Sequence, residues 1–136
     1  MIQPEKINSY RDLLVWQKGM ALAKQVYALT QSFPLDERFG LVTQMRRAAV
    51  SVPSNIAEGQ ARHGKREFVQ FLSHAQGSLA ELDTQLALAI EFGYPRDPDV
   101  SPSIALIAEL QRMLASLRRK IEDRLATNHS SPKGFS

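Results

Sequence analysis

An unbroken apolar repeat between residues 68 and 89 is the feature that most restricts how this chain can fold. Apolar residues recur there at alternating steps of four and three, at Phe68, Leu72, Ala75, Leu79, Leu82, Leu86 and Ala89. Such steps place the side chains on one stripe of an α-helix, and their regular alternation is typical of helices that pack side by side. The segment therefore predicts a long helix over residues 65–92, ended by Gly93 and Pro95.

Three further segments carry helical apolar periodicity, at residues 10–31, 36–58 and 102–126. Their connections are short, which makes neighbouring helices antiparallel. We therefore expect an all-α, up-down-up-down antiparallel four-helix bundle that forms a single domain over residues 1–126. The loop between the second and third helices is expected at Gly59–Gly64, and residues 127–136, which are polar and aperiodic, are expected to form a disordered tail.

The second helix carries a polar stripe about 110° from its apolar stripe, at a helical turn of roughly 100° per residue. Its members are Gln44, Arg47, Ser51, Asn55 and Glu58, and a similar stripe on the third helix contains His74, Ser78, Glu81 and Gln85. If these helices are antiparallel, the stripes face each other and Arg47 comes within about a turn of Glu81. We predict a partly buried polar network with an Arg47–Glu81 pair, with two solvated flanks as the open alternative.

A third side of the second helix is small and largely apolar, and it contains Arg46, Val50, Pro53 and Ala57. A helix with apolar residues on two sides is either central in its own bundle or packed against another subunit. We therefore predict self-association through this face, and a central position of the helix remains the alternative.

The amino-acid composition limits the kinds of functional site that this chain can form. Its 136 residues contain no cysteine, and no apolar run approaches the length of a membrane span. We expect a cytoplasmic protein without a cofactor. His63, His74 and His129 include no pair at the i, i+3 or i, i+4 spacing of a helical metal site, and no Glu-x-x-His motif occurs. We predict no metal site and no enzymatic activity; an acid–base group at His74, Ser78 and Glu81 is the remote alternative.

Basic residues gather in two places, although the net charge is only +3. One cluster is Arg62, Lys65 and Arg66, and the second contains Arg118, Arg119 and Arg124 with Arg112 and Lys120 nearby. No aromatic residues are interleaved with them, so binding to nucleic acid would be directed at phosphates, with weak sequence preference. Because Glu122 and Asp123 lie among the second cluster, a solvated helix face is the alternative there.

Three segments also carry a resemblance to a family: LLVWQKGMALAKQVYALTQSFP, QMRRAAVSVPSNIAEG and REFVQFLSHAQGSLAEL. Over residues 10–95 the chain resembles the four-helix bundle proteins encoded in intervening sequences of bacterial 23S rRNA, which are related to the accessory proteins of diversity-generating retroelements. The resemblance implies a helical bundle, homopentamers and binding of nucleic acid, principally RNA. An alternative that it implies is a scaffold for a protein partner such as a reverse transcriptase. After Arg96 the resemblance is weaker.

Overall fold

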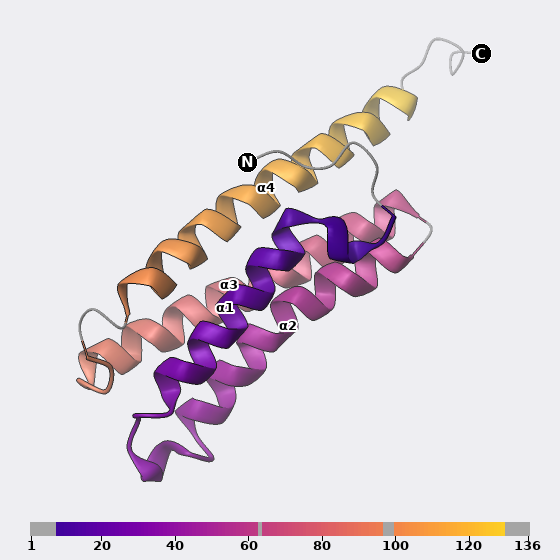
Figure 1. Ribbon diagram of the computed structural model, residues 1–136. Coiled ribbons are helices and arrows are strands. Elements are labelled where there is room, and N and C mark those ends of the chain that lie inside the picture. The colour runs from indigo at the N-terminus through magenta and orange to yellow at the C-terminus, as the bar shows by residue number, and fades with distance from the viewer. Residues whose placement is uncertain (1–7, 63, 97–99, 130–136) are drawn as a thin grey trace.

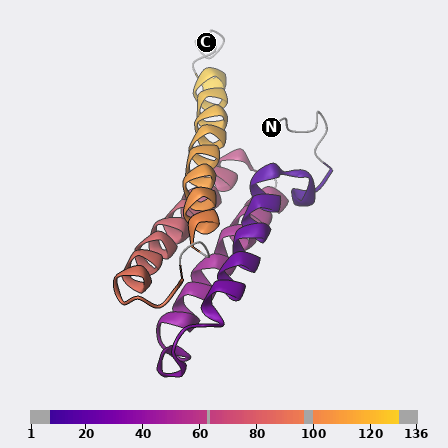
Figure 2. The same cartoon turned by 60° about the vertical axis from the view of Figure 1, so that its left-hand side comes forward.

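The computed structural model describes residues 8–62, 64–96 and 100–129 of the chain. This part of the chain forms four α-helices and two short 3-10 helices, with no strand: η1 (Tyr10–Asp12), α1 (Leu14–Thr30), η2 (Leu35–Glu37), α2 (Leu41–Ala61), α3 (Lys65–Glu91) and α4 (Ser101–His129). Figure 1 shows α1, α2 and α3 running along one another, and Figure 2 shows α4 inclined to them. The predicted all-helical four-helix bundle is confirmed.

Contacts between the helices give their relative directions. Thr30, at the end of α1, meets Arg46 of the first half of α2, whereas Gly19 lies against Pro53 further along α2. Residue numbers therefore fall along α1 as they rise along α2, so these two helices are antiparallel. In α2 and α3, Gly59 lies against Phe71 and Ser51 bonds to Ser78, which makes this pair antiparallel as well.

The core is formed by residues from all four helices. Among the largest fully buried side chains are Leu22 and Val26 of α1, Met45, Val52 and Ile56 of α2, Leu72, Leu79 and Leu82 of α3, and Ile107, Leu110 and Leu114 of α4. The predicted stripe of α3 is buried from Leu72 to Ala89, and Phe68 at its start is half-buried. Burying this stripe removes apolar surface from water and is the main stabilising contribution to the fold.

Helix α2 begins later and ends later than the sequence analysis predicted. The Leu41 N–H, which has no partner within the first turn of α2, donates to Glu37 Oε1 at 3.1 Å, so η2 supplies the polar group at the helix start. At the other end α2 continues to Ala61, and Gly59 is a buried helix residue. The predicted loop at Gly59–Gly64 is therefore wrong over its first half.

Helix α4 continues to His129, three residues beyond the predicted end at residue 126. The predicted tail is thus wrong for residues 127–129, because the helical hydrogen bonding persists after the apolar pattern has ended. Residues 130–136 lie outside the described residues, and their disorder stays a prediction.

Candidate nucleic-acid interface

One residue of each basic cluster, Lys65 and Arg124, meets the other at one end of the bundle. Helix α3 begins at Lys65 and α4 ends beside it, as Figure 1 shows for the start of α3 and the end of α4. Lys65, Asp123, Arg124 and Thr127 line a shared surface pocket of about 290 Å³. Residues almost sixty positions apart in the sequence therefore form one charged surface, with Asp123 as its acidic member.

Arg62 is less available than its place in the sequence implied. Its guanidinium lies 3.0 Å from the Glu58 carboxylate and 3.6 Å from the Glu67 carboxylate. It also lies over the Phe71 ring, 5.3 Å from the centroid. These exposed ion pairs add little stability. They neutralise part of the positive charge on Arg62 that would otherwise attract a phosphate.

Arg118 is a packing residue between α4 and α3. Its guanidinium donates to Ser73 Oγ at 3.0 Å and to Gln76 Oε1 at 2.8 Å, and lies 3.7 Å from the Glu122 carboxylate. A half-buried arginine that holds two helices together cannot also turn outward without breaking these contacts. Its predicted contact with phosphate therefore stays a prediction, and in the structure its guanidinium is engaged with α3.

The other predicted cations lie at the surface. Lys65, Arg66, Arg119 and Arg124 are all exposed, as is Lys120. These residues, together with the exposed Arg112, are accessible to a polyanion.

The two polar stripes meet only at their centre. The Ser51 and Ser78 hydroxyl oxygens are joined by a hydrogen bond of 2.5 Å between α2 and α3. Asn55 Nδ2 donates to the Ser51 carbonyl at 2.7 Å, and the buried Gln85 donates through Nε2 to Glu81 at 3.3 Å. Both serines are half-buried, and their short side chains satisfy each other between the helices.

The outer members of the stripes are solvated. Gln44, Arg47, Glu58, His74 and Glu81 are exposed. Within the described residues no ion pair joins Arg47 to Glu81. The predicted buried pair is therefore wrong, because both long side chains reach water from the edge of the helix interface and keep their charges hydrated.

The face of α2 predicted for self-association is largely covered by α1. Arg46 Nε donates to Thr30 Oγ1 at 2.9 Å, its guanidinium lies 4.5 Å from the centre of the Tyr27 ring, and Pro53 is buried against Gly19. Ala57 is half-buried. Of the four residues only Val50 is exposed, because α2 packs between α1 and α3. Self-association through this face stays a prediction, with Val50 as its accessible member.

Sequence reasoning missed a polar link between the two connections at the opposite end of the bundle. The Tyr94 hydroxyl, after α3, donates to Glu37 Oε2 of η2 at 2.8 Å. The hydrogen bond from the Leu41 backbone, followed by that from Tyr94, lowers the pKa of Glu37, and the bond to Glu37 raises the pKa of Tyr94. No periodic signal marks such a pair, since both residues lie outside the α-helices.

The described residues contain no group of histidine, aspartate and glutamate side chains arranged to hold a metal ion. A search of the helices in this part of the chain found none of sufficient length and hydropathy to cross a membrane.

Comparison with known proteins assigns the chain to a family. The profile described as 23S rRNA-intervening sequence protein matches residues 11–116. The chain belongs to this family. Its resemblance to proteins encoded in 23S rRNA intervening sequences is thereby confirmed. The match ends before the basic end of α4, so Arg119 and Arg124 lie outside the part that the 23S rRNA-intervening sequence protein family has in common with this chain.

The fold is also found among solved structures. One of these is a protein of unknown function from the S23 ribosomal protein family of Bacteroides thetaiotaomicron, with a TM-score of 0.69 and 20% sequence identity. The similarity covers 77% of this chain and 98% of that chain. At this identity the likeness concerns the fold alone. A search of curated proteins found no match to this member of the 23S rRNA-intervening sequence protein family.

Proposed function

We propose that this protein is a non-enzymatic homo-oligomer that binds nucleic acid, principally RNA, through its phosphates. The observation that carries the proposal is the shared pocket of Lys65 and Arg124, which joins the start of α3 to the end of α4. Exposed cations that project from two helix ends towards one surface provide the electrostatic contact that phosphates require. Membership in a family named for 23S rRNA intervening sequences is consistent with RNA as the ligand.

The contacts in the structure reduce the set of cations that we propose to bind phosphates. Lys65, Arg66, Arg119 and Arg124 are the proposed phosphate contacts, whereas Arg62 and Arg118 support the surface through their contacts with acidic and polar neighbours. Contacts to phosphates carry no base information, so we expect weak sequence preference.

Oligomerisation strengthens this surface. One chain has a net charge of only +3, which is too small for tight binding by a single cluster. A closed ring, with the pentamer implied by the family resemblance as the proposed form, repeats the pocket on every protomer, and several weak contacts then act on one RNA.

Salt-dependent binding to mixed-sequence RNA tests the proposal. The logarithm of the binding constant should fall steeply with the logarithm of salt concentration, and Lys65→Ala with Arg124→Ala should reduce the slope by about two for each protomer in contact. The matched control is Arg38→Ala with Arg96→Ala, which removes the same charge from exposed positions at the opposite end of the bundle. The control should change the slope by less than about one.

Two results would overturn the proposal. An equal loss in both double variants would indicate general attraction to a basic protein and not a site at the pocket. Absence of salt-sensitive binding to both RNA and DNA, together with retention of a purified protein partner, would favour the alternative function of a scaffold.

A further inference from the structure

Helices α1 and α4 are held together at one end and leave a groove at the other. Lys18 Nζ donates to the Glu109 carboxylate at 3.1 Å, and Ser103 Oγ donates to Gln25 Oε1 at 3.0 Å. Both contacts involve the first third of α4, and Figure 2 shows α4 lying at an angle to α1. Beyond them a groove of about 300 Å³ opens, lined by Leu14, Val15, Arg112, Met113, Ser116, Leu117 and Lys120.

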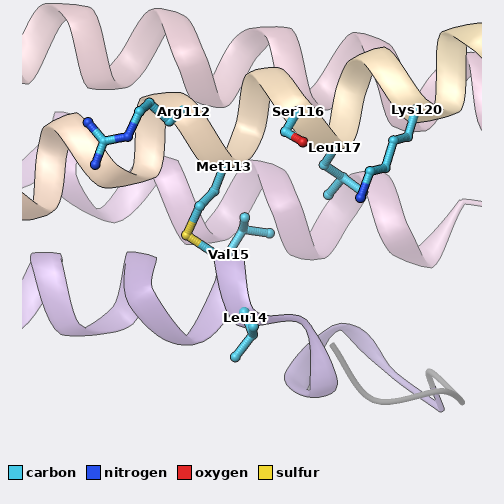
Figure 3. Close-up of a pocket in the computed structure, with 7 residues that line it drawn as sticks. All are labelled: Leu14, Val15, Arg112, Met113, Ser116, Leu117 and Lys120. Carbon is cyan, nitrogen blue, oxygen red and sulfur yellow. The ribbon is translucent and has the colours of Figure 1, made fainter. Parts of the chain in front are cut away.

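The floor of this groove is apolar. Met113 and Leu117 lie one turn apart on α4, and Figure 3 shows them on the side of the helix that faces Leu14 and Val15 of α1. Val15 is buried, whereas Leu14, Met113 and Leu117 are only half-buried, and Met113 and Leu117 pack at the edge of the core. A third helix can bury its own apolar stripe against such an apolar groove floor between two inclined helices.

The rim of the groove is basic. Arg112 and Lys120 are exposed and lie eight residues apart on α4, which corresponds to about 12 Å along the helix. Neither makes a hydrogen bond or ion pair with any residue in the described ranges 8–62, 64–96 and 100–129, and no acidic side chain lines the groove. The site therefore combines an apolar floor with a cation towards each end.

We propose that this groove binds an acidic amphipathic helix of a partner protein. Such a helix would place apolar residues at i, i+3, i+4 and i+7 against Met113 and Leu117, and carboxylates about two turns apart against Arg112 and Lys120. A small anionic amphiphile carries its charge at one end and would leave one cation without a partner. Nucleic acid would contact the cations without covering the apolar floor. The proposal is independent of the phosphate-binding function.

Peptide binding to the full chain tests the proposal. The probe is a fluorescein-labelled peptide of about 16 residues with leucines on one helical stripe and glutamates flanking them two turns apart. Its control carries lysine at each glutamate position. By fluorescence anisotropy the acidic peptide should bind at least about tenfold more tightly than the basic one. The double variant Arg112→Glu with Lys120→Glu should reverse this preference, because both positions are exposed and the floor is unchanged.

A second variant tests the groove itself. Ser116→Trp should fill the space above the floor and weaken binding of the acidic peptide, with circular dichroism as the check on folding. If Ser116→Trp unfolds, the double variant Arg112→Glu with Lys120→Glu still tests whether the groove binds the acidic peptide. Equal binding of the two peptides, or an unchanged preference after charge reversal, would overturn the proposal.

Two other occupants would also overturn it. If the acidic peptide binds only after residues 1–7 are removed, the N-terminal segment of this chain is the occupant. If mixed RNA displaces the peptide and the charge-reversed variant also loses RNA binding, the groove is part of the nucleic-acid surface.

Discussion

At the residue scale, two helical glycines have opposite surroundings. A Cβ added at Gly59 of α2 would lie 2.6 Å from Phe71 Cβ and 3.1 Å from Phe68 Cδ1. A Cβ added at Gly77 of α3 would meet nothing within 4 Å. Gly59 was predicted to begin a loop, whereas glycine is required there for the close approach of α2 and α3.

We expect Gly77→Ala to stabilise the protein by about 0.5–1 kcal/mol, because alanine has the higher helix propensity and enters open space. Gly59→Ala should destabilise it by about 1–3 kcal/mol, because overpacking against Phe71 outweighs the same gain in propensity. Urea denaturation of the two variants measures the difference. Similar free energies of unfolding for both would contradict the close packing at Gly59.

Ionisation of Glu37 should affect the stability of the protein in acid. Since its pKa in the folded protein is lowered by the hydrogen bonds from Leu41 and Tyr94, its contribution is present above the unfolded pKa and is lost as pH falls through the folded pKa. Glu37→Gln should therefore lower the melting temperature at neutral pH, and the gap to the wild type should narrow in acid. Asp36→Asn, at the exposed neighbouring residue, is the control. A gap that stays constant with pH would contradict the assignment.

At the element scale, the polar contact between the two stripes of α2 and α3 is made by serine hydroxyl groups and not by charged side chains. Ser51 and Ser78 share a hydrogen bond between the helices, whereas Arg47 and Glu81 are exposed. Hydroxyls at a helix interface lose little side-chain entropy on folding, and exposed long side chains gain little from pairing.

A pair of double-mutant cycles tests this difference. Ser51→Ala with Ser78→Ala should give a coupling energy of about 0.5–1.5 kcal/mol, as expected for one hydrogen bond between partly buried groups. Arg47→Ala with Glu81→Ala should give less than about 0.3 kcal/mol. A larger coupling for the charged pair than for the serines would show that the salt bridge forms in solution.

At the scale of the whole molecule, the exposed apolar surface between α1 and α2 is the proposed contact between copies. Met20, Tyr27 and Val50 are 37%, 44% and 41% exposed, and they line one surface hollow of about 480 Å³. Val50 is the one residue of the predicted self-association face that stays accessible, because the others are engaged with α1 or half-buried. Apolar side chains gathered on one surface favour contact with another protein surface.

Light scattering in solution tests self-association. We expect a mass several times the 15.2 kDa of one chain, with five copies as the proposed number. Val50→Asp should shift the mass towards the monomer, because an unpaired charge would be buried in the contact. Leu88→Asp, at a similarly exposed apolar residue of α3, is the control and should leave the mass unchanged. A wild-type mass near 15.2 kDa at micromolar concentration would reject oligomerisation.

The helices and their buried stripes were accessible from the sequence because helical periodicity is local: residues three or four apart lie on one face whatever surrounds them. The seam from Leu72 to Ala89 is buried as its spacing predicts, and α2 buries Met45, Val52 and Ile56. The two basic clusters could also be predicted from the sequence, because the residues of each cluster lie close together along the chain.

Which cations are accessible to a ligand could be learned only from the tertiary structure. Lys65 and Arg124 share a pocket because α3 begins where α4 ends, which depends on the arrangement of helices far apart in the sequence. Arg118 is engaged by α3 and Arg62 by its acidic neighbours, although the sequence gives these arginines the same charge as the exposed ones. Charge is a property of the residue, whereas availability depends on the distance to groups on other elements.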